Sequence, residues 1–409
     1  MQPLVDVARA EFLYEQPSPH GSCQEHCEQN QGDRSSNRDC IHLRYLQSSD
    51  GVCPASECQA FSLAGRDDHK SPTHQDAAAR RSGIVEYHSI LQLSRVTFHV
   101  ALLIGTDEAG YGPNLGPLLI STTAWRVQGD DSDIDLYERL NHCILSNATS
   151  DQHIPICDSK QLYKPGGGLL NLERGVFAAL SVHGMTMACW RDAWQVLAPD
   201  SAEQLQTVPW YAKYDTALPI NLGDERRAAD RSLLTAGLQA ANVSLERIRS
   251  TAIFPTRFNE LVERYDSKGA VLSLATLELV RDALEQHDDA TVFIQCDKHG
   301  GRNRYLAVLQ TVFPDERIKI LRESRESSVY RWVTPSRQIE IRFVAKGESF
   351  LPAALASMTA KYLRELAMQA FNAFWQQQLP DLKPTAGYPV DAQRFKNDVE
   401  MVQRKLGIE

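Results

Sequence analysis

The chain has 409 residues, of which 43% are hydrophobic and 23% charged, and its formal net charge is −9. These values are typical of a soluble globular protein and exclude a globally basic nucleic-acid-binding coat. No apolar run reaches the roughly 20 residues that cross a bilayer, and the first residues lack the basic-then-apolar pattern of a secretory signal. We therefore expect a cytoplasmic protein that is not embedded in a membrane.

Residues 1–97 differ in composition from the rest of the chain. The first 100 residues hold seven of the 12 His and five of the nine Cys, and they show no sustained apolar periodicity. We predict that this segment is disordered, or that it is a leader upstream of the true start of the protein. Zinc binding is an alternative, but the pair Cys23 and Cys27 is not followed by the second tight pair that zinc sites usually contain.

From residue 98 onward, strand and helix signals alternate, which predicts an α/β domain with a mixed sheet. Strands are expected at residues 99–105, 117–127, 185–196, 290–296 and 338–345, the last of them at a sheet edge. Helices are expected at residues 169–182, 269–287, 303–313 and 349–378. Residues 349–409 would form a helical C-terminal part.

Two neighbouring carboxylates, Asp107 and Glu108, stand at the end of the first apolar run and are followed by a glycine-rich turn. Burying a carboxylate costs several kcal/mol unless a cation or hydrogen bonds compensate. The pair therefore indicates a metal site. The alternative is a strand-terminal Asp that caps the turn, with a solvated Glu beside it.

Two further acids, Asp297 and Glu365, have apolar neighbours in the sequence or on the same helix face. Asp297 ends the apolar strand at residues 290–296, and its carboxylate would lie next to Asp107 if the two strands are neighbours. Glu365 lies on an otherwise apolar stripe of the long helix, together with Met358 and Tyr362. Taken alone, Asp297 is equally consistent with a turn-initiating residue, and Glu365 with a boundary residue whose carboxylate reaches solvent.

Five segments in order resemble the motifs of ribonuclease HII. The first motif of that family reads Asp-Glu-Ala-Gly-Arg-Gly-Pro, and the others read Asp-Ser-Lys-Lys-Leu, Lys-Gly-Asp, Ala-Ser-Ile-x-Ala-Lys-Val-x-Arg-Asp and His-Lys-Gly-Tyr. The matching segments here are Asp107–Pro113, Asp158–Leu162, Lys346–Glu348, Ala356–Glu365 and Gly387–Tyr388. The resemblance covers about three quarters of the chain and none of the first hundred residues.

The resemblance implies an α/β, ribonuclease H-like mixed β-sheet flanked by helices, with a C-terminal helical part. Residues 98–409 would be the catalytic domain, and residues 195–245 an insertion of unknown purpose. Asp107, Glu108, Asp297 and Glu365 would be both the catalytic residues and the metal ligands. Such a hard-oxygen cluster suits two Mg²⁺ or Mn²⁺ ions, about 4 Å apart, that promote phosphodiester hydrolysis.

The implied activity is endonucleolytic cleavage of the RNA strand of RNA–DNA hybrids, or of DNA at embedded ribonucleotides, which leaves 5′-phosphate and 3′-hydroxyl ends. The predicted substrate-binding residues are Gly110, Tyr111, Gly112, Ser159, Lys160 and Tyr388. Gly110, Gly112 and Tyr388 match residues that read the RNA–DNA junction in the family. Tyr111 departs from the pattern, because it replaces an Arg that could bind phosphate with two charged hydrogen bonds.

Two other functions compete with this reading. The chain could be a metal-dependent nuclease of the same fold that acts on structured RNA or on DNA. It could also be a nucleic-acid-binding protein without activity, although such a protein has no need for four carboxylates. In each case we expect a monomer that binds nucleic acid.

Overall fold

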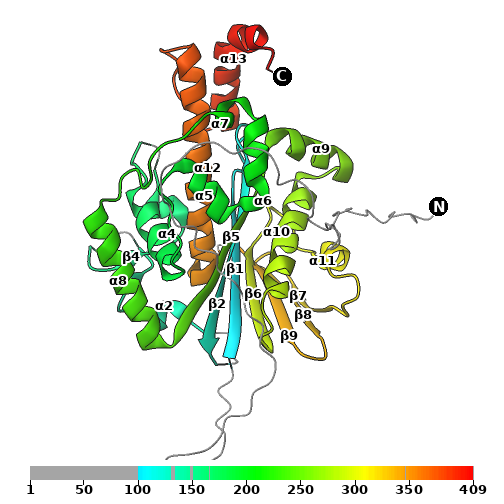
Figure 1. The fold of residues 1–409 in the computed structure, drawn as a ribbon. Coiled ribbons are helices and arrows are strands. Elements are labelled where there is room, and N and C mark those ends of the chain that lie inside the picture. The colour runs from blue at the N-terminus through cyan, green and yellow to red at the C-terminus, as the bar shows by residue number, and fades with distance from the viewer. Residues whose placement is uncertain (1–99, 130–133, 148–150, 165, 346, 409) are drawn as a thin grey trace, which may run out of the picture. The chain divides into compact units, whose positions relative to one another are not determined.

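A mixed seven-stranded sheet lies at the centre of the computed structural model, which describes residues 100–129, 134–147, 151–164, 166–345 and 347–408 (Figure 1). The spatial order of its strands is β5–β2–β1–β6–β9–β8–β7. In this order the strands span Val243–Ile253, Leu118–Gln128, Val100–Ala109, Thr291–Asp297, Gln338–Val344, Ser327–Val333 and Lys319–Glu323. The predictions for residues 1–97, including the zinc alternative, lie outside the described residues.

The strand directions decide which strand ends meet. Strands β5, β2 and β1 are antiparallel neighbours, whereas β6 runs parallel to β1 and β9 runs parallel to β6. Strands β8 and β7 then continue the sheet in antiparallel fashion. The carboxyl ends of β1, β6 and β9 therefore lie side by side at one edge of the sheet.

Helices cover both faces of the sheet because successive residues of β1 point to opposite sides. Leu103 packs in the core that contains α4 (Leu170–Val182) and the long helix α12 (Leu351–Gln378). Leu102 packs in a second core, with α10 (Lys268–Glu285) and α11 (Leu306–Val312). The remaining helices are α2 (Leu136–Arg139), α3 (Ser159–Leu162), α5 (Trp190–Leu197), α6 (Pro199–Ala202), α7 (Pro209–Ala212), α8 (Asp224–Ala241), α9 (Pro255–Tyr265) and α13 (Pro389–Leu406), and two 3-10 helices span Glu203–Thr207 (η1) and Gly347–Ser349 (η2). Strands β3 (Ile144–Leu145) and β4 (Ile154–Pro155) form a separate two-stranded sheet.

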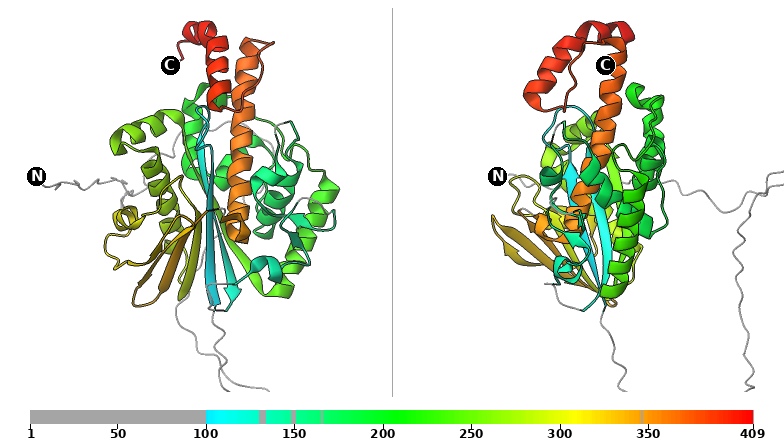
Figure 2. Two further views of the ribbon diagram at one scale, coloured as in Figure 1. Left: turned by 180° about the vertical axis from the view of Figure 1, so that it is seen from behind. Right: turned by 90° about the vertical axis from the view of Figure 1, so that its left-hand side faces the viewer.

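The predicted α/β fold class is confirmed in its mixed sheet, its flanking helices and its helical C-terminal part. The last turns of α12 and helix α13 extend beyond the sheet (Figure 2). These two helices pack through an apolar cluster that includes Phe371, Trp375 and Phe395. Within the described part of the chain, no helix is both long and apolar enough to cross a membrane.

Two sequence-based expectations about the sheet were wrong. Residues 185–196 do not form a strand, because Trp190, Ala193, Trp194 and Leu197 are buried at helical spacing in α5. The expected edge strand is the internal strand β9, since β8 and β7 follow it across the sheet.

Strands β5, β7 and β8 and helix α9 were not anticipated. Strand β5 occupies one edge of the sheet and begins at Val243, within the range assigned to an insertion. The rest of that range, residues 195–245, contains α6, η1, α7 and α8.

Helix α12 approaches β1 most closely at Gly105. A Cβ atom at this position would lie 2.1 Å from the backbone nitrogen of Ala353 and 2.2 Å from the carbonyl carbon of Pro352. Only a residue without a side chain lets the helix backbone come this near to the strand. This contact fixes the distance between the strand that carries Asp107 and the helix that carries Glu365.

We therefore expect Gly105→Ala to lower the free energy of unfolding by about 3 kcal/mol, because backbone atoms of α12 have no room to move aside. Gly112→Ala is the matched control, since a Cβ atom there would have nothing within 4 Å. Urea unfolding of both variants measures the difference. Equal stabilities for the two variants would show that the close approach at Gly105 does not constrain the fold.

Candidate metal centre

Three carboxylates lie close together at the C-terminal ends of two neighbouring strands of the sheet. Asp107 and Glu108 are near the end of β1, and Asp297 is the last residue of β6. Because Thr106 pairs with Cys296 in the parallel register, Asp107 and Asp297 follow on adjacent strands. One oxygen atom from each of the three carboxylates lies within 4.8 Å of the others. Among the described residues, this group matches three of the four acids predicted from the sequence.

Burial and neighbouring negative charges shift the ionisation of Glu108. Burial, followed by the negative charges of Asp107 and Asp297, raises the pKa of Glu108 well above its ordinary value of 4.5. The positive charge of Lys160 acts in the opposite direction on this pKa. Asp107 is only 9% exposed, and its Oδ1 accepts a hydrogen bond of 2.8 Å from the backbone N–H of Glu108. The group therefore concentrates negative charge where water screens it poorly.

The donor set suits a hard divalent cation. Carboxylate oxygens are the preferred ligands of Mg²⁺ and Mn²⁺, and a cation bound among three of them would offset both their mutual repulsion and the cost of burying them. The crowding that raises the pKa of Glu108 is the electrostatic situation that a bound cation relieves. Asp107, Glu108 and Asp297 are therefore the residues that could hold one or two such ions.

Gly347, the central residue of the Lys-Gly-Glu motif, also lies at this end of the sheet. It follows β9, which is the parallel neighbour of β6. The backbone N–H of Gly347 donates to Oδ1 of Asp297 at 3.4 Å, and the side-chain amide of Gln295 donates to the carbonyl oxygen of Gly347 at 3.0 Å. The backbone of this motif thus contacts the carboxylate group directly.

Glu365, the fourth acid predicted from the sequence, does not join the group of three. Its carboxylate accepts a hydrogen bond of 2.6 Å from the hydroxyl of Tyr163 and forms an ion pair with Lys361, one turn earlier in α12. The Lys361 ammonium also lies 4.5 Å from the centre of the Tyr163 ring. Neither Tyr163 nor Lys361 was identified from the sequence as part of a site.

The glycine-rich loop after β1 is attached to the segment that carries Tyr388. The backbone N–H of Asn114 donates to the carbonyl oxygen of Gly387 at 2.7 Å. Gly387 has a φ of +83°, and a Cβ atom there would lie 2.6 Å from the carbonyl oxygen of Leu115. The structure thus brings together two motifs that are more than 270 residues apart in the sequence, and Tyr388 is 56% exposed beside them.

Arg364 in α12 is hydrogen-bonded to both the glycine-rich loop and the segment before Tyr388. It is 3% exposed, and its guanidinium donates to the carbonyl oxygens of Pro117 at 2.8 Å, Leu115 at 2.9 Å and Ala386 at 3.2 Å. A buried arginine that binds three carbonyl groups fixes both segments with little freedom. This role could not be predicted from the sequence, because an arginine that precedes a glutamate in a helix is typical of a surface residue.

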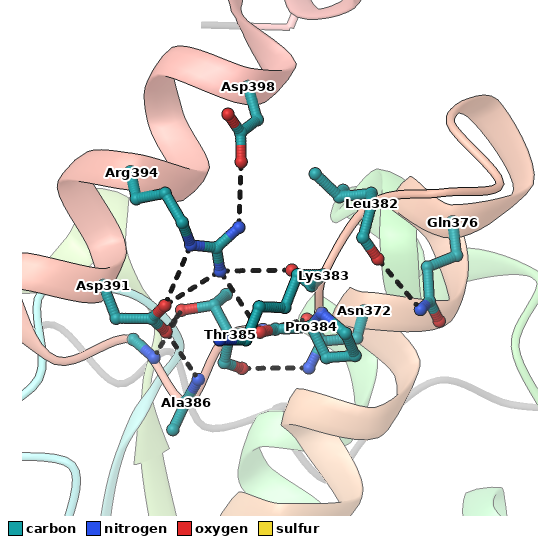
Figure 3. Close-up of polar contacts among 11 residues, drawn as sticks. Asn372, Gln376, Leu382, Lys383, Pro384, Thr385, Ala386, Asp391, Arg394 and Asp398 are labelled. Carbon is teal, nitrogen blue, oxygen red and sulfur yellow. Dashed lines mark hydrogen bonds and ion pairs between the residues drawn. The ribbon is translucent and has the colours of Figure 1, made fainter.

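A second set of hydrogen bonds holds the other side of the Tyr388 segment (Figure 3). Asn372 in α12 exchanges two hydrogen bonds with the backbone of Thr385, at 2.8 and 2.9 Å. Asp391 in α13 accepts from the Thr385 hydroxyl and binds Arg394. Arg394 in turn donates to the carbonyl oxygens of residues 383 and 384. The backbone before Tyr388 is therefore fixed by both C-terminal helices.

The other predicted substrate-binding residues differ in their exposure. Gly112 is exposed, and Gly110 has a φ of +100°, which a residue with a side chain rarely adopts. Tyr111 is half-buried against the apolar cluster around Leu118. Its placement is therefore that of a packing residue as well as a surface residue.

Ser159 and Lys160 begin the short helix α3. Ser159 is buried, and its hydroxyl accepts a hydrogen bond of 3.0 Å from Ser357 in α12. Lys160 is exposed and close enough to lower the pKa of Glu108. Of these two residues, Lys160 is the exposed one.

Neither a protein-family model nor a curated protein sequence matches this chain. Solved structures with a similar arrangement include ribonuclease H2 from Pyrococcus horikoshii OT3, with 15% identity and a TM-score of 0.35 over 75% of this chain and 89% of that one. They also include RNase HII in its complex with PCNA from Archaeoglobus fulgidus, with 13% identity and a TM-score of 0.32 over 75% of this chain and 91% of that one. Bst-RNase HIII in complex with Mn²⁺ has 14% identity and a TM-score of 0.32 over 77% of this chain and 66% of that one. Similarity at this level identifies no family.

The raised pKa of Glu108 leads to a stability prediction. In the unfolded chain Glu108 loses its proton near its ordinary pKa of 4.5, whereas the folded protein retains the proton to higher pH. The stability that this group contributes is therefore fully present below pH 4.5 and falls as the pH rises toward the raised pKa. We expect Glu108→Gln to remove this fall.

At pH 7.5 without metal, Glu108→Gln should raise the melting temperature by about 2 °C or more. Added Mn²⁺ should stabilise the wild type more than the variant, since the variant lacks one ligand charge. Thermal unfolding with and without Mn²⁺, at pH 5 and pH 7.5, measures both effects. A variant that is less stable than the wild type in metal-free buffer would contradict the electrostatic account of the site.

Proposed function

We propose that the protein is a metal-dependent endonuclease of the ribonuclease HII type, which hydrolyses the RNA strand of RNA–DNA hybrids or DNA at embedded ribonucleotides. The observation that carries the proposal is the convergence of Asp107, Glu108 and Asp297 at the ends of two parallel strands. Phosphodiester hydrolysis with divalent cations needs few side chains other than such a carboxylate group.

The chemistry follows from the carboxylate group. Mg²⁺ or Mn²⁺ bound there would activate water on one side of the phosphodiester and stabilise the leaving 3′ oxygen on the other, so that the product carries a 5′-phosphate and a 3′-hydroxyl. Asp107, the most buried of the three acids, is suited to contact both ions. Lys160, at the border of the group, is suited to bind a phosphate oxygen of the substrate.

Recognition of a ribonucleotide requires a contact to its 2′-hydroxyl. The glycine loop offers backbone atoms without side chains at Gly110 and Gly112, and Tyr388 stands exposed next to that loop. An exposed phenol on a rigid backbone can stack on a sugar or donate a hydrogen bond to it. We therefore propose that these residues select the ribonucleotide.

A fourth carboxylate ligand was predicted from the sequence at Glu365, but both of its oxygens are engaged by Tyr163 and Lys361.

Asp107→Asn should reduce Mg²⁺-dependent cleavage by at least about 100-fold, because it removes a ligand charge at nearly constant volume. Asp224→Asn is the control, since this Asp lies on α8 with its side chain 89% exposed, and it should cleave at the wild-type rate. The substrates are a duplex with one ribonucleotide, an RNA–DNA hybrid, plain duplex DNA and structured RNA.

Cleavage of plain DNA or of structured RNA alone would favour the alternative of a related nuclease with another substrate. Binding without cleavage of any of the four would favour a non-catalytic nucleic-acid-binding protein. Asp107→Asn within tenfold of the wild type would mean that Asp107 does not bind the metal.

Tyr388→Ala should lower kcat/KM for the duplex with one ribonucleotide by about tenfold, the effect expected from one lost stacking or hydrogen-bonding contact. Val390→Ala is the matched control, because Val390 is 89% exposed two residues further along. Steady-state kinetics of both variants provide the measurement. If both variants behave like the wild type, Tyr388 does not contact the substrate.

A further inference from the structure

The short helix α3, which carries Lys160, is attached to α12 at both ends. At its start, the hydroxyl of Ser357 donates to that of Ser159 at 3.0 Å. At its end, the hydroxyl of Tyr163 donates to Oε2 of Glu365 at 2.6 Å. Tyr163 is the residue immediately after α3. Because a four-residue helix has almost no stability of its own, its position depends on these contacts and on the burial of Leu162 in the core.

The residues that attach α3 occupy one face of α12. Ser357, Lys361 and Glu365 are spaced four residues apart, which places them one above another on the helix. Lys361 forms an ion pair with Oε1 of Glu365, and its ammonium lies 4.5 Å from the centre of the Tyr163 ring. Lys361, Glu365 and Tyr163 thus form a three-membered cluster in which each member contacts the other two.

This cluster offsets the negative charge of Glu365 with the positive charge of Lys361. One of its oxygens contacts the Lys361 ammonium and the other accepts from the Tyr163 hydroxyl. Its side chain is 15% exposed, so these contacts are only partly screened by water. To bind a metal in the acid group, Glu365 would have to leave both partners, and the partly buried Lys361 would lose its counter-charge.

Between the two attachment points, α3 presents Lys160. This residue is exposed on the helix and acts on Glu108 as a nearby positive charge. Lys160 therefore lies at the border between the acid group and solvent, where a substrate phosphate would arrive. Its distance from the acids depends on how firmly α3 is attached to α12.

We propose that Glu365, with Tyr163 and Lys361, is a positioning group that holds Lys160 beside the acid group, and that Glu365 is not a metal ligand. The positioning of Lys160 matters for cleavage only if the proposed nuclease function holds, whereas the claim that Glu365 does not bind metal is independent of that function. The effect on cleavage and the effect on metal binding are therefore tested separately.

The first test is calorimetric titration of the full chain with Mn²⁺, without nucleic acid. Glu365→Gln should bind Mn²⁺ with an affinity within about twofold of the wild type, whereas the matched variant Asp297→Asn should lose at least about tenfold. A loss for Glu365→Gln as large as that for Asp297→Asn overturns the proposal. This result does not depend on whether the protein cleaves nucleic acid.

The second test is steady-state cleavage of the preferred duplex at saturating Mn²⁺. Tyr163→Phe removes only the hydroxyl that binds Glu365, and it should raise KM by about fivefold while kcat stays within about twofold, because Lys160 is no longer held to receive the phosphate. Ser357→Ala, which releases the other end of α3, should act in the same direction. Glu365→Gln keeps an oxygen that can accept from Tyr163 and should retain more activity than Glu365→Ala.

A double-mutant cycle identifies the residue through which the group acts. In a Lys160→Met background, Tyr163→Phe should have no further effect on KM, since the residue that it positions is already absent. Fully additive effects of the two substitutions overturn the proposal, as does an unchanged KM for Tyr163→Phe in the wild-type background. If the wild type cleaves no nucleic acid, the nuclease function fails, and the Mn²⁺ titration still decides the role of Glu365.

Discussion

The mutual repulsion of three carboxylates, those of Asp107, Glu108 and Asp297, is the force that the surrounding fold must withstand. Three carboxylates with oxygens within 4.8 Å of one another do not stay together unless a rigid frame holds them. The parallel pairing of β1 and β6 supplies that frame, because each strand end is fixed by backbone hydrogen bonds to its neighbour. The resulting site is unfavourable without a cation, as the raised pKa of Glu108 indicates, and is correspondingly well suited to bind one.

Helix α12 transmits this rigidity to the surroundings of the site. It lies against β1 at a glycine, Gly105, so that strand and helix are fixed relative to each other. From that position, successive residues of α12 reach different segments: Ser357 and Glu365 hold α3, Arg364 holds the glycine loop, and Asn372 holds the backbone before Tyr388. The groups proposed to contact substrate therefore all depend on one buried helix, and the glycine loop and the Tyr388 segment are also hydrogen-bonded to each other.

The parts of the fold that could be predicted from the sequence were those with a strong periodic signal. The hairpin of β1 and β2, strand β6 and helices α10 and α12 have long apolar patterns, and their predictions were confirmed. Helix α5 was misassigned because eight residues are too few to separate helical from strand periodicity. Strand β5 was missed although Val243, Leu245 and Ile248 are buried on it, since a bulge next to Trp125 interrupts its register.

In the candidate site, too, some residues could be predicted from the sequence and others could not. Asp107, Glu108 and Asp297 were predictable because each stands where an apolar strand ends. The partners of Glu365 were not, since Tyr163 is 202 residues away in the chain and no local pattern links the two. Arg364 illustrates the same limit, because its carbonyl partners come from two loops that meet only in the folded protein. Side-chain to backbone contacts across such separations leave no periodic trace in the sequence.

The most direct test of the account is a crystal structure of the protein soaked in Mn²⁺, with the ion located by its anomalous scattering. We expect a Mn²⁺ ion bound by the carboxylates of Asp107, Glu108 and Asp297, with Glu365 still hydrogen-bonded to Tyr163. A peak at another place, or a Mn²⁺ ion that draws Glu365 away from Tyr163, would contradict it.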